Sequence, residues 1–172
     1  MLKIYCDGST KVKNKKGVEN IGGFGIVVYN EKNEIIRVYS EQKRNTTNNE
    51  MELVALGISI MLFGTKDAWD CPTIYSDSMY AINCYTKWAS TWERNNWIKS
   101  DGKPVENKEI ISTVYTDYLK TGKYNVNIEY CPGHSGIEGN ELADKLATGE
   151  LTPQEVLNGY KNFETRNNKD SK

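Results

Sequence analysis

Acidic residues in this chain stand where carboxylates could act together on a metal ion. Asp7 and Asp77 each follow a short apolar run of strand type, and Glu52 lies within a long apolar run. In open sheets with parallel strands, ligands collect beyond the carboxyl ends of neighbouring strands. Carboxylates brought together repel one another, and a hard cation that prefers oxygen ligands relieves the repulsion. We therefore expect magnesium or manganese here, since the chain lacks the Cys/His ligand spacing typical of zinc.

Most acidic candidates also have a structural explanation when each is read alone. Asp7 precedes a glycine, and Asp-Gly is a common turn pair. Asp77 lies where a strand gives way to a helix, which is an N-cap position. A fourth acid, Asp144, fits a solvated helix surface, because an i,i+4 Glu–Lys pair lies beside it. Spacing alone does not decide between these interpretations and catalysis.

Glu52 has no such explanation. The neighbouring Glu50 forms a T-x-x-E capping box with Thr47 at the start of a predicted helix. Glu52 lies almost opposite Glu50, on an arc shared with apolar side chains, and no basic residue stands three or four positions away. A carboxylate in such surroundings costs several kcal/mol unless it is paired or binds a metal. We expect Glu52 to find its partner elsewhere in the fold.

The elements that must position these acids follow from hydrophobic periodicity. Runs rich in Ile, Val and Tyr predict strands over residues 2–7, 23–30, 34–40, 73–76 and 124–131. Helical patterns cover residues 48–63, 78–88, 108–121 and 138–148. The first helix is apolar nearly all round and is expected to be buried. Three strands followed by alternating helices and strands predict an α/β fold, a mixed sheet covered by helices.

Length and charge limit the class of protein. A chain of 172 residues fits one domain, which we place at 1–149, and 22 basic against 23 acidic residues give a net charge of −1. This balance argues against a general nucleic-acid coat protein, which would be strongly basic. It allows a nuclease, because an acidic metal centre and a local basic surface cancel in the sum. Residues 150–172 are expected to form an extension, with a short helix after Thr152 and then a flexible tail.

The compartment is predicted from what the chain contains. The first residues are charged too early for a signal peptide, and no apolar run approaches the ~20 residues that cross a bilayer. The four cysteines form no C-x-x-C pair, and Cys6 and Cys131 end apolar runs where a thiol behaves as a small buried hydrophobe. We expect a reduced, cytoplasmic protein without membrane contact, and a monomer.

Five motifs, in order, resemble those of type 1 ribonuclease H. They are Y-C-D-G-S at 5–9, T-T-N-N-E-M-E-L at 46–53, Y-S-D-S at 75–78, G-H-S-G at 133–136 and N-E-L-A-D-K-L-A at 140–147. The resemblance spans about residues 2–148, and five ordered motifs are far more specific than a single D-G-S. It implies a ribonuclease H-like fold, whose five-stranded mixed sheet has three antiparallel strands, then two parallel ones, and helices on both faces.

The resemblance also implies an activity, namely endonucleolytic hydrolysis of the RNA strand of RNA–DNA hybrids that leaves 3′-hydroxyl and 5′-phosphate ends. The implied catalytic metal ligands are Asp7, Glu52, Asp77 and Asp144. They would hold two Mg²⁺ ions ~4 Å apart, for which Mn²⁺ can substitute. His134, which alone would be an incidental surface residue, gains an accessory role, because an imidazole with a pKa near ~6.5 can relay a proton or assist product release.

Contacts with the hybrid are implied as well. Asn48 and Asn49 would reach the minor groove, where the 2′-hydroxyl distinguishes RNA from DNA. Thr47 would hold a DNA phosphate, although helix capping explains it equally well. Residues 88–108 resemble the substrate-binding handle of bacterial and eukaryotic members, whose tryptophans pack and whose lysines meet phosphates. The corresponding residues here are Trp88, Lys99 and Lys103.

Several departures from the family pattern bear on substrate affinity rather than on the acids. The segment 11–21 is longer and richer in lysine than usual, and Met79 stands where a substrate-contacting Gln is common. Glu50 occupies a position that is often basic. Two rival functions therefore stay open: another nuclease on the same fold, and an inactive hybrid-binding module. Inactive derivatives usually lose one or more acids, whereas this chain keeps all four.

Overall fold

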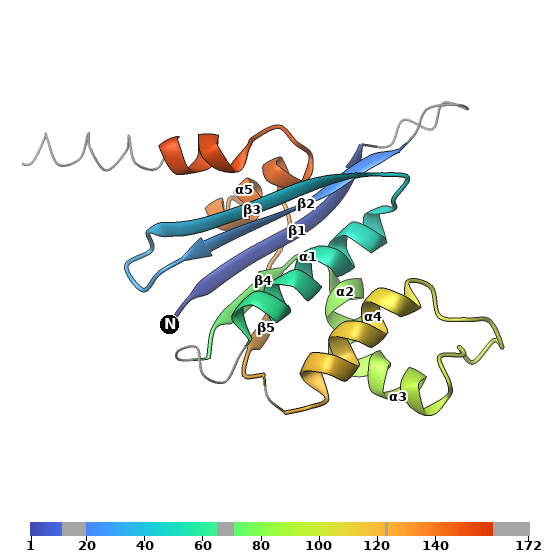
Figure 1. Cartoon of the computed structure of the whole chain (residues 1–172). Helices are drawn as coiled ribbons and strands as arrows, with labels where there is room; N and C mark the ends of the chain where they lie inside the picture. The colour runs from blue at the N-terminus through green and yellow to red at the C-terminus, as the bar shows by residue number, and fades with distance from the viewer. Residues whose placement is uncertain (12–19, 65–70, 123, 160–172) are drawn as a thin grey trace, which may run out of the picture.

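The computed structural model describes residues 1–11, 20–64, 71–122 and 124–159 (Figure 1). Most of the lysine-rich segment 11–21 and the predicted flexible tail lie outside the described residues. No helix in the described ranges is long and apolar enough to span a membrane.

Five strands form one mixed sheet in the order β3-β2-β1-β4-β5. Antiparallel pairing joins β1 (Lys3–Lys11), β2 (Ile21–Tyr29) and β3 (Ile35–Arg44). The short strands β4 (Thr73–Ser76) and β5 (Asn127–Tyr130) continue the sheet in parallel from β1. The predicted fold class, three antiparallel strands followed by two parallel ones, is confirmed.

The first strand is longer than predicted, and this changes the interpretation of Asp7. β1 continues to Lys11 because β2 pairs with it along its full length, and Asp7 lies opposite Gly25 in that ladder. The alternative that Asp7 belongs to a turn is therefore wrong. The parallel pairing of β1 with β4 ends at Tyr5, so Asp7 nevertheless lies just beyond the carboxyl end of the parallel part of the sheet.

Helices cover both faces of the sheet. They are α1 (Asn48–Phe63), α2 (Met79–Asn83), α3 (Ala89–Arg94), α4 (Lys108–Val114) and α5 (Glu138–Ala147). The prediction for α1 is confirmed residue by residue. A π-helical segment, η1 (Cys84–Trp88), joins α2 to α3, so the second helical region runs to Arg94, beyond its predicted end. A second segment, η2 (Tyr115–Leu119), continues α4.

Two hydrophobic cores lie between the helices and the sheet, one on each face of the sheet. Ile4 and Cys6 of β1 are fully buried in the larger core, which α1, α2 and α4 close. Alternation along the strand turns Tyr5 and Asp7 to the opposite face, where α5 packs (Figure 1). The central part of α1 is buried as predicted, whereas Met61 and Leu62 near its end are exposed. Asp7 thus faces α5 from a strand whose other face carries α1.

The chain beyond α5 also contributes to the smaller core. Residues 153–159 form a helix that begins with reciprocal hydrogen bonds between Thr152 and Glu155. Val156 is buried there with Val27 and Ile35 of the sheet. This helix therefore covers apolar sheet surface that α5 leaves open.

Replacing the buried Val156 with alanine should lower the free energy of unfolding by about 1–3 kcal/mol, because two methyl groups leave a packed site. Urea denaturation followed by circular dichroism measures this change. Gln154→Ala, at an exposed position of the same helix, should stay within about 0.5 kcal/mol of the parent. Equal stabilities for Val156→Ala and the parent would show that this helix is not docked in solution.

Candidate active site

Two glycines bring the helices that carry acids close to Asp7. A Cβ on Gly8 would lie 2.0 Å from the Met51 carbonyl carbon, so the first turns of α1 rest directly on β1. A Cβ on Gly25 would lie 2.1 Å from the Ala143 carbonyl oxygen, so α5 rests equally closely on β2. Both positions require glycine because a backbone occupies the place of a side chain. The two contacts bring Glu52 and Asp144 toward Asp7 from opposite faces of the sheet.

Glu52 is half-buried and has two hydrogen-bond donors. Its Oε1 accepts from Asn48 Nδ2 at 2.6 Å, and its Oε2 accepts from Ser78 Oγ at 2.5 Å. Glu52 was expected to have a partner from another part of the chain. That partner is the hydroxyl group of Ser78 and not a basic side chain. Burial raises the pKa of Glu52 and the nearby Asp77 raises it further, while the bonds from Ser78 and Asn48 act against this rise. The net result is a raised pKa.

Asp77 follows β4 and does not cap the next helix. Ser78 is the N-cap of α2, since its hydroxyl accepts from the Ala81 N–H at 3.1 Å. The capping interpretation of Asp77 is therefore wrong, and its carboxylate is available for other contacts. Asp77 Oδ2 accepts from Asn140 Nδ2 at 3.1 Å. A Cβ on Gly133 would lie 2.8 Å from the same oxygen, so the G-H-S-G loop rests against Asp77.

The charges of the other three acids act on the carboxyl group of Asp7. Asp7 is only 8% exposed, and burial is the main reason why its pKa is raised to about 8. The charges of Asp77, Asp144 and Glu52 raise it further, against a 2.7 Å hydrogen bond from the Gly8 N–H. All three other acids thus lie within electrostatic reach of Asp7, which is the arrangement expected of a shared cation site.

The chemistry of these donors fits divalent magnesium. Within the described ranges, none of the four carboxylates forms an ion pair with Lys or Arg. No three Asp, Glu, His or Cys side chains of the described residues form a ready-made set of metal ligands. Mg²⁺ does not need such a set, because it keeps several waters and binds through one or two carboxylates together with substrate phosphates. A cation here would also favour the ionised form of Asp7, whose pKa is raised by burial and by the charges of the other three acids.

His134 is exposed in the loop that rests against Asp77. Its φ is +50°, in the left-handed region that residues other than glycine seldom adopt. The neighbouring Gly133 makes the contact with Asp77. The loop therefore holds His134 at the surface beside the acids rather than within their hydrogen-bond network.

The first turn of α1 gives different roles to the predicted substrate contacts. Thr47 accepts from the Glu50 N–H at 3.2 Å, and the Glu50 carboxylate is bonded by the Thr47 backbone in return, so the predicted capping box is confirmed. Asn48 lies between the Thr10 N–H and the Glu52 carboxylate. Asn49 is exposed. Of these three side chains, Asn48 is the one that contacts an acid of the group.

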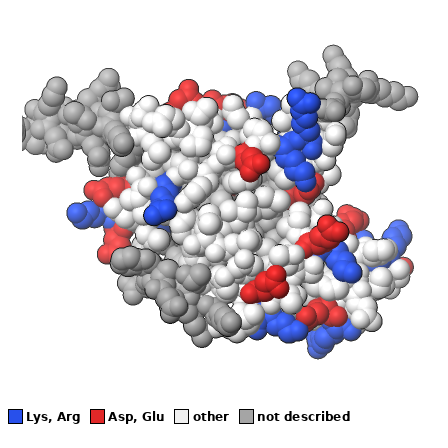
Figure 2. Space-filling view, in the orientation of Figure 1, with Lys and Arg blue, Asp and Glu red and all other residues white. Residues whose placement is uncertain are grey.

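The predicted handle carries both packing and charge. The Trp88 ring, 39% exposed, lies 5.6 Å from the Trp92 ring, so the tryptophans pack as expected. Lys99 is 3.4 Å from Glu106, and Lys103 is 4.0 Å from Asp101. Acidic and basic side chains are interspersed over the region of α3 and α4 in Figure 2. Each of the two lysines thus has a carboxylate beside it.

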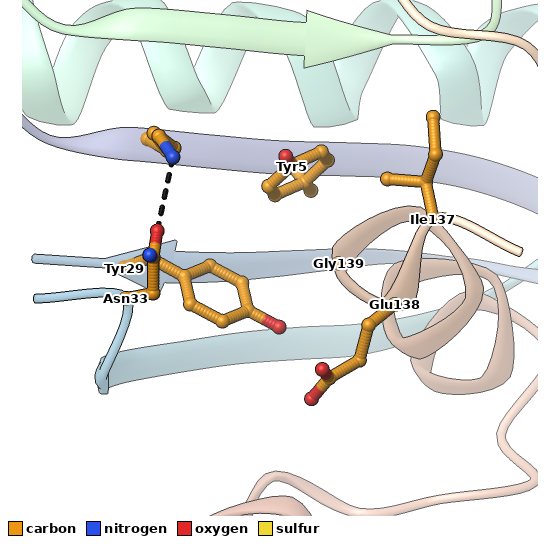
Figure 3. Close-up of a pocket in the computed structure, with 7 residues that line it drawn as sticks. Tyr5, Tyr29, Asn33, Ile137, Glu138 and Gly139 are labelled. Atoms are coloured by element: carbon orange, nitrogen blue, oxygen red, sulfur yellow. Dashed lines mark hydrogen bonds between the residues drawn. The ribbon is translucent and has the colours of Figure 1, made fainter.

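A shallow pocket lies on the same sheet face as Asp7 but contains none of the four acids (Figure 3). Lys3 donates to Asn33 at 2.9 Å on one side of it, and Glu138 of α5 lies on the other. Its floor includes the Tyr5 ring, and a Cβ on Gly139 would lie 2.2 Å from that ring. The pocket therefore marks where the start of α5 rests on β1.

Three residues of this network were not predicted as functional. Ser78 bonds Glu52, Asn140 bonds Asp77, and Cys131 Sγ donates to Asn140 Oδ1 at 3.3 Å. A signal existed for Asn140, because it precedes Asp144 by four residues and so shares its helix face. Burial, with the charges of Asp77 and Asp7, raises the pKa of the Cys131 thiol to about 11, so the thiol keeps its proton.

The strand order, with its antiparallel and then parallel pairing, defines the class of protein: the chain has the ribonuclease H fold. Among solved structures, a type 1 RNase H with the type 2 active-site motif matches with a TM-score of 0.69 and 26% identity, over 88% of this chain and 73% of that one. The RNase H domain of prototype foamy virus matches with a TM-score of 0.68 and 24% identity, over 85% of this chain and 91% of that one, a likeness of fold alone.

Sequence comparison identifies the family. The sequence model of RNase H matches residues 1–152. Ribonuclease H of Francisella philomiragia is 37% identical over 152 residues, which cover 86% of this chain and 91% of that protein. Ribonuclease HI of Haemophilus influenzae is 34% identical over 146 residues, which cover 85% and 86%. The chain belongs to the RNase H family.

Ionisation of Asp7 should destabilise the metal-free protein. Because its folded pKa of about 8 lies above the ordinary ~3.9, the folded state binds this proton more tightly than the unfolded state. The resulting stability is fully present below ~4 and is lost as pH rises toward ~8. In EDTA, the parent should lose on the order of a few kcal/mol between about pH 5 and about pH 8, and Asp7→Asn should lose less. Urea denaturation at both pH values measures this difference.

Magnesium supplies the control for this titration. Mg²⁺ should restore stability to the parent at the higher pH and have a smaller effect on Asp7→Asn. The same pH dependence in both proteins would mean that the folded state does not raise the pKa of Asp7.

Proposed function

We propose that this chain is an endonuclease that hydrolyses the RNA strand of RNA–DNA hybrids and leaves 3′-hydroxyl and 5′-phosphate ends. The observation that carries the proposal is the convergence of Glu52, Asp77 and Asp144 on the buried Asp7 in a member of the RNase H family. These four acids are the proposed ligands of two Mg²⁺ ions, with Mn²⁺ as a substitute. When bound, such ions activate the attacking water and stabilise the leaving oxygen.

The side chains around the acids prepare them for this role. Ser78 and Asn48 hold both oxygens of Glu52, and Asn140 holds one oxygen of Asp77. Partners of this kind orient metal ligands and reduce the freedom that metal binding must remove. Asp7 ionises more readily once a cation offsets its neighbours. His134 is proposed to move a proton or assist product release from the adjoining loop.

A hybrid substrate is supported by the relatives and by the surface beside the acids. The relatives described above are named ribonuclease H, and a foamy viral protease-reverse transcriptase with 21% identity and a TM-score of 0.70 has been solved with an RNA/DNA hybrid. Asn48 and Asn49 are proposed to contact the minor groove, and Thr47 a DNA phosphate. In the handle, Trp88 is proposed to support the surface on which Lys99 and Lys103 meet phosphates in competition with their own carboxylates.

We also propose the domain bounds, the oligomeric state and the cellular compartment of the enzyme. Residues 1–149 would form the catalytic domain, with 150–172 as its extension, and the protein would act as a monomer. The four cysteines are free in the structure, which supports a reducing, cytoplasmic compartment.

Substrate choice is tested by incubating the protein with labelled RNA–DNA hybrid, duplex DNA and duplex RNA in the presence of Mg²⁺. We expect cleavage of the RNA strand in the hybrid, with 5′-phosphate on the products. Preferential cutting of duplex DNA would favour another nuclease on the same fold. Binding of the hybrid without turnover in Mg²⁺ or Mn²⁺ would favour the inactive hybrid-binding module.

Loss of a proposed metal ligand should nearly abolish cleavage. Glu52→Gln and Asp77→Asn should each reduce kcat by more than about 100-fold. Loss of a residue that only hydrogen-bonds a metal ligand typically costs about 10- to 100-fold. Asp117→Asn, which removes an exposed carboxylate on η2, should leave kcat unchanged. Hybrid cleavage and thermal melts on the same samples separate catalysis from folding. If Glu52→Gln unfolds the protein, Glu52 has a structural role instead.

His134→Ala should lower kcat less than either of these ligand variants, because the four carboxylates remain in place. An unchanged kcat would mean that His134 is an incidental surface residue.

A further inference from the structure

We propose that Cys131 is a positioning residue for the acid group: its thiol orients the Asn140 amide, and that amide orients the Asp77 carboxylate. This inference rests on the proposed metal site, but it does not depend on which nucleic acid is cut.

The backbone places Cys131 beside Asp77 through strand pairing. β4 and β5 run parallel, with Ser76 paired to Tyr130 at their carboxyl ends. The Cys131 N–H donates to the Ser76 carbonyl at 3.0 Å, one residue beyond that pair. Ser76 precedes Asp77 as Tyr130 precedes Cys131, so the sheet register fixes the two side chains as neighbours.

The hydrogen bonds run in one direction from the sulfur to the carboxylate. Cys131 Sγ lies 3.3 Å from Asn140 Oδ1, and Asn140 Nδ2 lies 3.1 Å from Asp77 Oδ2. A thiol donates to the oxygen end of the amide, and a carboxylate accepts from the nitrogen end. Both contacts therefore favour the same orientation of the Asn140 amide. Together they hold its oxygen and its nitrogen, whereas the bond to Asp77 alone would hold only the nitrogen.

Burial makes this restraint effective. Cys131 is 3% exposed and Asn140 is 2% exposed. A buried amide oxygen that loses its donor has little access to water as a replacement. The Asn140 side chain is therefore expected to change its position. The freed amide would take up new positions, and the Asp77 carboxylate would follow it.

Within the part of the chain that the structure describes, the other core cysteines have no hydrogen bond that leads to Asp77. Cys6 Sγ donates to the Tyr75 carbonyl at 3.6 Å, and Cys84 lies in the π-helical segment η1 within the larger core. Cys131 is thus more than the small buried hydrophobe that its place after an apolar run predicts. At this position a hydrogen-bond donor matters, and the volume of the side chain is secondary.

The test compares variants that separate donor from volume, with Mn²⁺ binding to the protein alone measured by isothermal titration calorimetry. Cys131→Val removes the donor and should raise the Kd for Mn²⁺ by about threefold, the lower part of the ratio for one hydrogen bond, because a thiol is a weak donor. Cys131→Ala, which adds no bulk, should behave in the same way. Cys131→Ser keeps a donor and should remain within about twofold of the parent.

A matched control and a double variant locate the effect. Cys84→Val removes a buried thiol of η1 that bonds none of the four acids within the described residues, and it should leave the Kd for Mn²⁺ unchanged, whatever it does to the melting temperature. In an Asn140→Ala background, Cys131→Val should cause no further loss, because the connection to Asp77 is already absent. In hybrid cleavage, Cys131→Val should raise the half-saturating Mg²⁺ concentration and leave KM for the hybrid at saturating Mg²⁺ unchanged.

Three results would overturn the inference. The Val and Ala variants could bind Mn²⁺ as tightly as the parent, the Ser variant could lose affinity as they do, or the loss could persist in the Asn140→Ala background. Because Mn²⁺ binding is measured without nucleic acid, failure to cleave hybrid would overturn the proposed function and leave this inference standing.

Discussion

The burial of Asp7 among other carboxylates is the constraint on which the rest of the site depends. A carboxylate that is buried on a central strand and faced by three other acids is stable as an anion only with compensation. Within the described residues that compensation does not come from Lys or Arg. The hydrogen bonds of Ser78, Asn48 and Asn140 orient Glu52 and Asp77 without neutralising them. We propose that a divalent cation supplies the missing charge, which would make this cluster the catalytic centre.

The architecture serves this cluster by close backbone contact. Gly8 and Gly25 allow α1 and α5 to rest on neighbouring strands from opposite faces, and the parallel pairing of β4 with β1 adds Asp77 at the same level. The cores on the two faces of the sheet hold these contacts, because each helix buries apolar side chains against the strands. Precision at the site thus comes from packing that lies outside it, as expected where ligands must be held before a metal binds.

Much of this arrangement could be predicted from the sequence, and the exceptions have physical reasons. The helix at 48–63 and the unexplained Glu52 followed from local pattern, because periodicity and capping act over one or two turns. The length of β1 did not, because β2 extends it by pairing beyond Asp7. The roles of Ser78, Asn140 and Cys131 depend on contacts between distant segments, which spacing along a chain does not encode. The handle was predicted as a phosphate-binding surface, yet Lys99 lies beside Glu106 and Lys103 beside Asp101. These carboxylates are only a few residues away in the sequence, but the turns of the chain decide whether they contact the lysines.

The most direct test of the account is the titration of the Asp7 carboxyl carbon by NMR, with and without Mg²⁺, assigned by comparison with Asp7→Asn. Without metal, the pKa should lie at about 8. With saturating Mg²⁺, it should fall to or below the ordinary value of ~3.9, because the cation favours the ionised form. An Asp7 carboxyl that titrates near ~3.9 under both conditions would contradict the claim that the four acids form one cation site.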